Sequence, residues 1–212
     1  MKGYEIVLNL QNQKCLIVGG GVVATRKVED LLLAGARVTV ISPQLAARLM
    51  ELEQQGLLNH WARAYQAGDL QGFFLVVCAT NDPETNNLVA QEAKSLGVLF
   101  NATENPQMGN FTRPSVVAVG KLNFTVHTAG VSPRLTRLLR EDLQAYYGED
   151  FGRFIEFMRE KRQVVKEKLN SAPARELFWR KYLTQETVRQ LHAGNIKKVE
   201  EEICDAISSL RS

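Results

Sequence analysis

The sequence predicts an α/β fold in which a parallel β-sheet carries helices on both faces. Residues 14–101 alternate short β-rich runs with longer helical runs, the order typical of parallel strands joined by crossover helices. The run 73-FFLVVCA-79 contains no polar side chain except a cysteine, which suits a central strand covered on both faces. After Phe111 the alternation ends, and helical patterns dominate residues 150–212.

Local patterns predict each element of the first part. Strands are expected over residues 16–18, 37–41, 57–61, 73–79 and 98–101. Helices are expected over residues 22–34, 44–55 and 81–97, each followed or ended by a glycine. In the third helix Asn81 or Asp82 can cap the first turn, and Pro83 fits that turn.

The later part begins with a hairpin pattern. Residues 114–130 hold two β-rich runs separated by Gly120-Lys121, which predicts a β-hairpin. Ser132 and Pro133 then predict the start of a helix that stops near Gly148. Residues 150–212 are expected to be helical throughout, with breaks near Pro173 and Gly194.

Composition narrows the class of protein. The chain has 212 residues, 45% hydrophobic and 23% charged, as globular proteins do. Its net charge of +3 is too small to indicate nucleic acid. Residues 1–133 carry ten basic and ten acidic side chains, so the excess lies entirely in residues 134–212. This excess fits either an anionic partner or solvated helix faces.

The cysteines and the apolar runs indicate a compartment. The three cysteines are isolated, which argues against a disulfide framework and suits a reducing cytoplasm. No apolar run approaches the roughly 18 residues that a membrane span needs, and the N-terminus lacks a signal-peptide core. We therefore expect a cytoplasmic protein without a membrane partner.

A glycine-rich motif predicts a dinucleotide site. Gly19-x-Gly21-x-x-Ala24 follows a predicted strand and opens a predicted helix, with Gly20 inside the turn. Gly19 permits the tight turn, Gly21 lets a pyrophosphate approach the backbone, and Ala24 allows close packing of helix and strand. The exposed N–H groups and the helix dipole favour an anion. This is the pattern of a Rossmann-type domain; the alternative is a glycine turn that binds no ligand.

Polar residues at two further strand ends extend this site. The second strand ends at 40-VISPQ-44 without an acid, which leaves Ser42 and Gln44 to bind the ribose. Because no arginine follows to hold a 2′-phosphate, NAD is favoured over NADP. Thr80 and Asn81 follow the apolar run and are expected to face the ligand crevice.

Glu104 is the candidate catalytic residue. It lies just past strand 98–101, at the sheet edge where ligands of open parallel sheets bind. A carboxylate near the nicotinamide can act as a general base for the proton lost during hydride transfer. The alternative is a solvated loop acid.

Several motifs together resemble the precorrin-2 dehydrogenase family, which includes part of the sirohaem synthases. The similar segments are 16-LIVGGGVVATRK-27, 36-ARVTVISP-43, 78-CATNDPETN-86, 101-NATENP-106, 111-FTRPS-115 and 127-HTAGVSPRLTRLLRE-141. The resemblance covers roughly residues 1–150 and weakens through the helical tail.

The resemblance implies an NAD-dependent oxidation of precorrin-2 to sirohydrochlorin. In some members ferrous iron is a further substrate and is inserted to give sirohaem. It also implies a homodimer with three parts: an NAD-binding Rossmann domain (1–112), a dimerisation segment (113–149) and a helical C-terminal domain (150–212). The family's NAD contacts fall on Val22, Val23, Pro43 and Gln44.

Two positions depart from the family pattern. The key acid of the family is an aspartate, and Glu104 stands in its place with a side chain one methylene longer. The family's serine in the strand-end motif, phosphorylated in some members, falls on Thr128, which keeps a hydroxyl. His127 beside it is expected to pack or to contact substrate rather than to bind metal.

Precorrin-2 carries eight carboxylates and therefore requires cations near its site. Arg134 and Arg137 recur with Arg140 at spacing three in a predicted helix, and Arg113 precedes the hairpin. The start of that helix at Ser132 is a further candidate anion site. The alternative is a solvated helix face with ordinary salt bridges. The leucines at 135, 138 and 139 point elsewhere on the helix and can be buried.

Two other functions remain open from the sequence. One is a ferrochelatase that keeps the dinucleotide fold without oxidising its substrate. The other is a non-enzymatic dinucleotide-sensing module. The three histidines are dispersed, so we expect no resident metal site.

Overall fold

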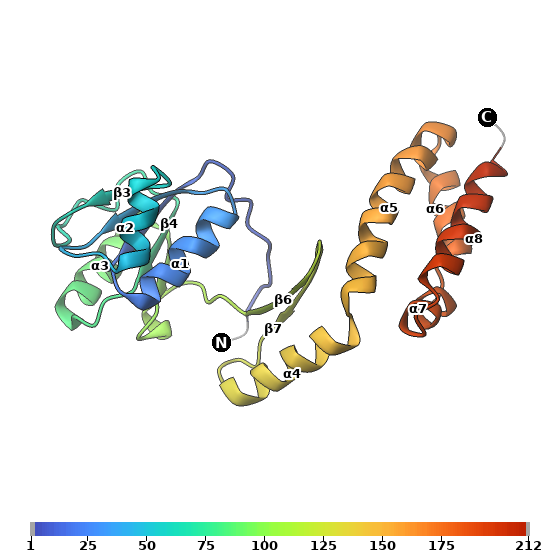
Figure 1. Ribbon diagram of the computed structural model, residues 1–212. Helices are drawn as coiled ribbons and strands as arrows, with labels where there is room; N and C mark the ends of the chain where they lie inside the picture. The colour runs from blue at the N-terminus through green and yellow to red at the C-terminus, as the bar shows by residue number, and fades with distance from the viewer. Residues whose placement is uncertain (1–2, 211–212) are drawn as a thin grey trace. The chain divides into compact units, whose positions relative to one another are not determined.

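The computed structural model describes residues 3–210. The chain forms two compact units: one spans Gly3–Arg113, and the other begins at Pro114. Figure 1 shows the α/β architecture of the first unit and the hairpin and helices of the second. Among residues 3–210, no helix is both long and apolar enough to cross a membrane.

A five-stranded parallel sheet forms the centre of the first unit. Its strands are β1 (Lys14–Val18), β2 (Arg37–Ile41), β3 (Leu58–Trp61), β4 (Leu75–Cys78) and β5 (Leu99–Ala102). They lie in the order β3-β2-β1-β4-β5, and every neighbouring pair is parallel. The direction of strand addition reverses between β1 and β4, the point where ligands bind in open α/β sheets. The predicted fold class is therefore confirmed.

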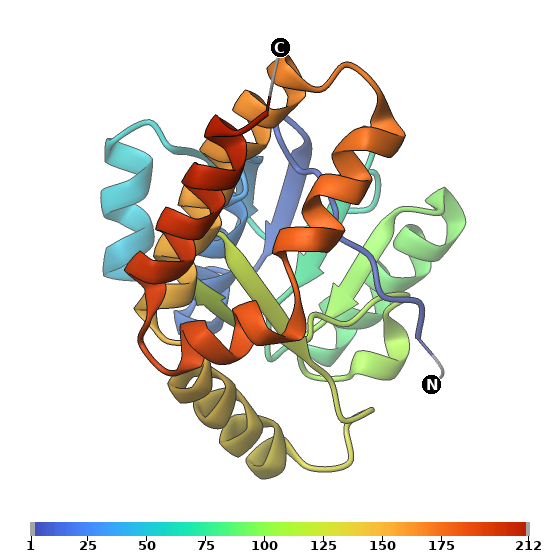
Figure 2. The same ribbon diagram turned by 90° about the vertical axis from the view of Figure 1, so that its right-hand side faces the viewer.

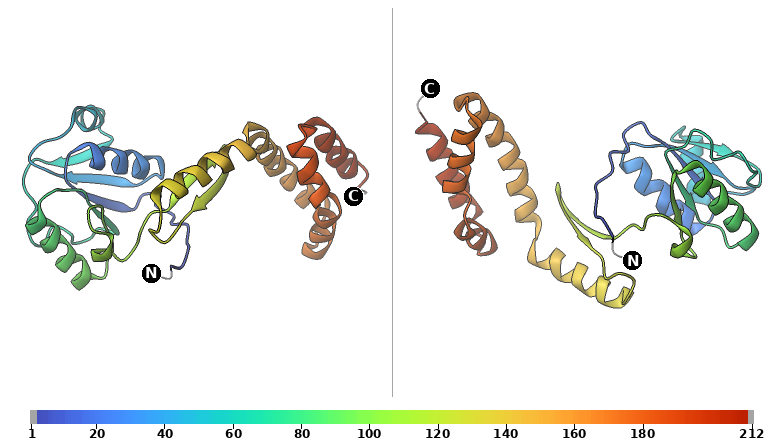
Figure 3. Two further views of the ribbon diagram at one scale, coloured as in Figure 1. Left: turned by 90° about the horizontal axis from the view of Figure 1, so that it is seen from below. Right: turned by 180° about the vertical axis from the view of Figure 1, so that it is seen from behind.

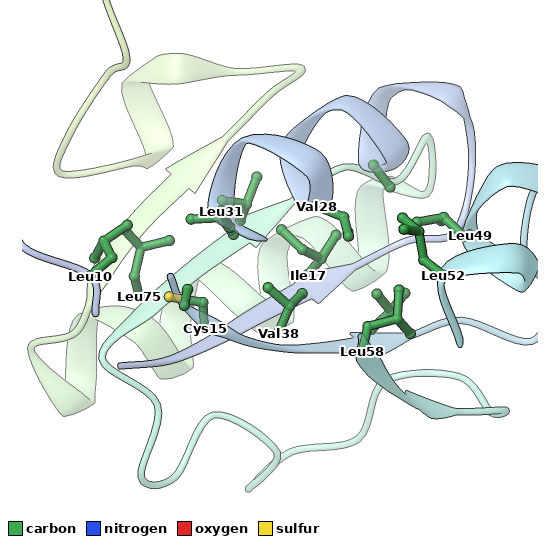
Figure 4. Packing of buried hydrophobic residues seen from close by; sticks show 14 residues of the cluster. Leu10, Cys15, Ile17, Val28, Leu31, Val38, Leu49, Leu52, Leu58 and Leu75 are labelled. Carbon is green, nitrogen blue, oxygen red and sulfur yellow. The ribbon is translucent and has the colours of Figure 1, made fainter. Parts of the chain in front are cut away.

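Helices cover both faces of this sheet. They are α1 (Val22–Leu33), α2 (Ala47–Gln54) and α3 (Pro83–Leu96), with a short 3₁₀ helix at Pro106–Met108. Figure 4 shows Val28 and Leu31 of α1 and Leu49 of α2 packed over Ile17 and Val38 of the central strands. On the other face, α3 packs against a second apolar cluster.

The second helix begins three residues later than predicted. Residues 42–46 form a turn instead, because the Ser42 hydroxyl donates to the carbonyl of Gln44 (2.7 Å). The amide of Ala46 donates to the carbonyl of Gly20 (2.8 Å), which ties this turn to the glycine loop. The Gln44 carbonyl thus accepts within the turn, and Ala46 has an extended backbone (ψ 152°) as the N-cap, so α2 begins only at Ala47.

The cap predicted for the third helix is confirmed at Asp82. Its carboxylate accepts from the amides of Glu84 (3.2 Å) and Thr85 (3.1 Å). Hydrogen bonds from Thr85 hold the pKa of Asp82 below its ordinary value. Gly97 ends the helix with a φ of +66°, a left-handed conformation that glycine adopts readily.

Within residues 114–210, the second unit contains the predicted hairpin and five helices. Strands β6 (Ser115–Val119) and β7 (Leu122–Val126) pair antiparallel, and α4 (Pro133–Tyr146) packs against them. The remaining helices are α5 (Glu149–Lys168), α6 (Ala172–Tyr182), α7 (Gln185–His192) and α8 (Ile196–Ser208). In Figure 2, α8 lies along α5, and Figure 3 shows α5 to α8 packed together.

The breaks in the helical part fall partly where the sequence predicts them. Pro173 lies in the first turn of α6, so the break precedes it, and Gly194 separates α7 from α8. A further break before α7 was not predicted. There the threonines at 184 and 187 form a reciprocal capping box that starts a new helix. The apolar cluster of this unit joins α5, α6, α7 and α8.

Candidate functional site

The glycine turn after β1 has two crowded positions and one open position. Gly19 has a φ of +117°, and a Cβ atom there would lie 2.4 Å from the carbonyl oxygen of Ala79. A Cβ on Gly20 would lie 2.1 Å from the carbonyl oxygen of Gln44. At Gly21 a Cβ would meet no atom within 4 Å. The first two glycines are therefore needed by the fold itself, whereas Gly21 borders open space.

The first turn of α1 presents unsatisfied amides to that space. Gly21 is the N-cap, no side chain caps it, and the first turn holds no acid. The first helical bond runs from the amide of Thr25 to the carbonyl of Gly21 (3.0 Å), so the preceding amides have no helical partner. Val22 and Val23 are exposed, and Ala24 is fully buried. These features suit the diphosphate of a dinucleotide.

The turn after β2 is held by internal hydrogen bonds. The Ser42 hydroxyl is occupied by its bond to Gln44, and Nε2 of His60 lies 2.9 Å from the carbonyl oxygen of Ser42. Ser42 is buried, whereas Pro43 and Gln44 are exposed. The structure therefore gives Ser42 a role in shaping the turn, and it leaves the Gln44 side chain facing solvent at this edge.

Asn86 organises the turn after β4, a role that the sequence analysis missed. Its side-chain oxygen accepts from the Thr80 hydroxyl and from the Cys78 thiol, both at 3.0 Å. Its amide nitrogen donates to the carbonyl of Thr80 (3.2 Å). Asn81 is exposed. Because Asn86 lies in the first turn of α3, it links that helix to the end of the neighbouring strand.

Replacing Asn86 by alanine is expected to lower the free energy of unfolding by about 1–2 kcal/mol, because Thr80 and Cys78 lose their shared partner. Chemical denaturation measures this change. The matched control is Asn87→Ala, since Asn87 is exposed on the same helix. Equal stability of the two variants would contradict the structural role of Asn86.

Glu104 lies in the loop after β5 with its carboxylate free. On one side, the amide and hydroxyl of Thr103 both donate to the carbonyl of Cys78 at 3.0 Å. On the other side, Asn105 accepts from the amide of Gln107 (3.2 Å). Glu104 is exposed, and within residues 3–210 it forms no hydrogen bond or ion pair. The hydrogen bonds of Thr103 and Asn105 thus hold the loop in place. Between them, the carboxylate of Glu104 lies without a partner at the carboxyl edge of the sheet.

The carboxyl ends of the parallel strands gather these residues at one edge of the sheet. The glycine turn follows β1, the Ser42 turn follows β2, Thr80 follows β4, and Glu104 follows β5. Arg113 lies in the same unit, where its guanidinium pairs with Asp30 of α1. It was predicted to bind substrate, and this ion pair occupies part of its hydrogen-bonding capacity.

The other predicted substrate contacts lie in the second unit. The Thr128 hydroxyl lies 2.8 Å from that of Thr136, and the Ser132 hydroxyl accepts from the amide of Leu135 (3.1 Å) as the cap of α4. His127 is exposed rather than packed. Arg134 and Arg137 are exposed on α4, and Nε of Arg137 lies 2.8 Å from the carboxylate of Glu141.

The leucines of α4, which the sequence leaves free to be buried, are partly exposed in the single chain. Leu135, Leu138 and Leu139 are 48%, 44% and 40% exposed, and α4 has no buried residue. They lie at i, i+3 and i+4 and so share one face of the helix. The hairpin covers α4 only in part, which leaves this face open.

Known proteins are similar to this chain over nearly its whole length. The siroheme synthase of Nitrosococcus oceani is 34% identical over 94% of this chain, and that of Chromobacterium violaceum is 36% identical over 84%. The chain spans less than half of these relatives, 43% and 38%. The solved structure of SirC, a precorrin-2 dehydrogenase, matches with a TM-score of 0.81 and 28% identity, covering 97% of this chain and 99% of that one.

The parallel sheet, the glycine turn and the open start of α1 define a Rossmann-type dinucleotide-binding domain. Residues 6–115 match a family described as "Putative NAD(P)-binding", and residues 150–207 match one described as "Sirohaem synthase dimerisation region". The chain therefore belongs to the family of precorrin-2 dehydrogenases and siroheme synthases.

Proposed function

We propose that this chain oxidises precorrin-2 to sirohydrochlorin with NAD. The observation that carries the proposal is its likeness to a precorrin-2 dehydrogenase over 97% of this chain and 99% of the other. A free carboxylate at the ligand-binding edge of the sheet supports it, because such an oxidation releases a proton as well as a hydride. Ferrous iron is proposed as a second substrate, inserted into sirohydrochlorin to give siroheme.

Each residue at the sheet edge then has a chemical role. The amides at the start of α1 bind the diphosphate over Gly21, where no Cβ obstructs it. Bound NAD supplies the hydride acceptor. Glu104 accepts the accompanying proton from the macrocycle as a general base. Precorrin-2 thereby loses two electrons and two hydrogens, one as hydride and one as a proton.

The turn after β2 favours NAD over NADP. Residues 42–46 contain no arginine or lysine that would hold a 2′-phosphate. The exposed Gln44 side chain offers hydrogen bonds to the ribose hydroxyls instead. Calorimetry with NAD and with NADP tests this preference, and tighter binding of NADP would contradict it.

The proposed reaction is tested by anaerobic incubation of the purified protein with precorrin-2 and NAD. Sirohydrochlorin and NADH should form together, as followed by absorbance, and ferrous ion is then added to detect siroheme. Iron insertion into sirohydrochlorin without NADH formation would favour a ferrochelatase. Binding of NAD without binding of any tetrapyrrole would favour a dinucleotide-sensing module.

We also propose that the protein is a homodimer. The match over residues 150–207 bears the description of a dimerisation region, and α4 has the open leucine face. This match begins after the 113–149 segment that the sequence analysis associated with dimerisation. Residues 150–207 and the leucine face of α4 are the two candidate surfaces for the contact. We favour α4 because its apolar face is covered only in part.

Leu138→Glu is expected to convert the dimer to a monomer, because a carboxylate would be buried in an apolar contact. Sedimentation equilibrium measures the mass. Leu33→Glu is the control, since Leu33 is 89% exposed in the first unit. If the Leu138→Glu variant stays dimeric, the dimer contact is instead expected within residues 150–207.

A further inference from the structure

A cleft of about 420 Å³ runs along α1 on the side that faces β5. Its α1 residues stand at i, i+3, i+4 and i+7 and therefore share one face of the helix. The cleft is lined by Val23, Arg26, Lys27 and Asp30 of α1, and by Asn101, Ala102, Thr103, Pro106, Thr112 and Arg113. Every lining residue belongs to the unit Gly3–Arg113.

Positive charge predominates in this cleft. It contains three cations, Arg26, Lys27 and Arg113, against a single acid, Asp30. Asp30 is already paired with Arg113. In the described part of the chain, neither Arg26 nor Lys27 forms an ion pair or hydrogen bond. Two cations thus line the cleft without an anionic partner.

Lys27 is the more constrained of these two cations. It is half-buried, and burial lowers its pKa, with a further lowering from nearby Arg113 that Asp30 opposes. A half-buried ammonium group without a partner is unfavourable unless an anion pairs with it. An anion in the cleft would meet Lys27 together with Arg26, one residue away on α1.

The cleft also adjoins the candidate catalytic acid. Thr103 and Pro106 line it, and Glu104 lies between them in the chain. The hydrogen bonds from Thr103 to the carbonyl of Cys78 hold this wall in place. A group bound in the cleft would therefore be anchored beside the loop that carries Glu104.

We propose that this cleft binds a carboxylate side chain of the tetrapyrrole substrate, with Arg26 and Lys27 as its partners. This inference rests on the proposed function and adds a substrate subsite to it. Carboxylates suit a site with a guanidinium and an ammonium group, which form charge-assisted hydrogen bonds with them. Anchoring one side chain of a large macrocycle here orients its ring toward Glu104.

The phosphates of the cofactor are the other anions that could occupy such a site. The start of α1 already offers free amides to a diphosphate, at Gly21. The cleft instead extends along the helix to Asp30, about two and a half turns beyond Gly21. Its occupant is therefore expected to be a second anion, distinct from the diphosphate, and the experiment separates the two.

The test is the double variant Arg26→Gln/Lys27→Gln in the full chain. The KM for precorrin-2 is expected to rise about tenfold, with kcat and the Kd for NAD within about twofold, because only substrate binding loses charge-assisted hydrogen bonds. Fluorescence titration with sirohydrochlorin should show a similar loss of affinity. Lys27→Arg, which keeps the charge, should retain most of the affinity for sirohydrochlorin.

The matched control is Arg37→Gln/Lys94→Gln, which removes the same two charges from exposed positions away from the cleft. Unchanged KM and sirohydrochlorin affinity in the cleft variant would overturn the subsite. Weaker NAD binding with unchanged tetrapyrrole affinity would show that Arg26 and Lys27 bind the cofactor. That result would also overturn the substrate subsite. If the wild-type chain binds sirohydrochlorin but forms no NADH, the proposed oxidation fails, while the titration still decides the subsite. The single variant Lys27→Met replaces the double variant if circular dichroism shows misfolding.

Discussion

Replacing Glu104 by glutamine is expected to lower kcat for the proposed oxidation of precorrin-2 at least about 100-fold, the scale of a lost general base. Glutamine has nearly the same size but cannot accept the proton that leaves with the hydride. The carboxylate has no partner in residues 3–210, so its loss leaves no buried group unsatisfied. Stability and NAD affinity are expected to stay unchanged. Anaerobic kinetics and calorimetry measure these quantities.

Two further variants sharpen this prediction. Glu104→Asp keeps the carboxylate but draws it back by one methylene, so a loss of about tenfold is expected, smaller than for glutamine. Glu84→Gln removes an exposed acid from the start of α3 at the same sheet edge and should leave kcat unchanged. Full turnover by the glutamine variant would remove Glu104 from the mechanism.

Gly19→Ala is expected to lower the free energy of unfolding by about 3 kcal/mol or more. The backbone there has a φ of +117°, and the new Cβ would lie 2.4 Å from the carbonyl oxygen of Ala79. The clash is with the backbone of Ala79, just after β4. Relieving it would require the backbone after β1 or after β4 to move, which would disturb the sheet. Urea denaturation measures the change, and a shift below about 1 kcal/mol would contradict this geometry.

Gly21 supplies the matched comparison in the same turn. Gly21→Ala should leave stability nearly unchanged, because its Cβ would meet nothing within 4 Å. Gly21→Asp can cap α1 and so preserve the fold, but it places a negative charge where the diphosphate is expected. NAD affinity should therefore fall without loss of stability. Undiminished affinity by calorimetry would count against the assignment of the glycine turn.

The order of elements could be read from the sequence because it depends on local patterns. Short β-rich runs separated by helical periods predicted all five parallel strands, and turn residues predicted the hairpin at Gly120. Helix ends were predicted where a nearby side chain or glycine makes the cap, as at Asp82 and Ser132. The start of α2 and the break before α7 were missed, since contacts to other segments or paired threonines decide them.

The candidate site was predictable in its backbone and less so in its side chains. Glycines and an acid at strand ends point to one sheet edge because parallel strands end on the same side. The partners of those side chains were not predictable. The Ser42 hydroxyl donates to the carbonyl of Gln44. The Thr80 hydroxyl, after β4, donates to the side-chain oxygen of Asn86 in α3.

The sequence by itself determined the parallel α/β unit, the glycine turn and the acid after the last strand. These depend on residue order, helix caps and the conformational freedom of glycine. The tertiary structure alone decided that the leucines of α4 lie exposed, and that Arg113 meets Asp30 from 83 positions away. It also placed Arg26 and Lys27 of α1 in the same cleft as residues of β5. The order of the strands in the sheet decides which distant segments become neighbours. No local sequence pattern encodes that order.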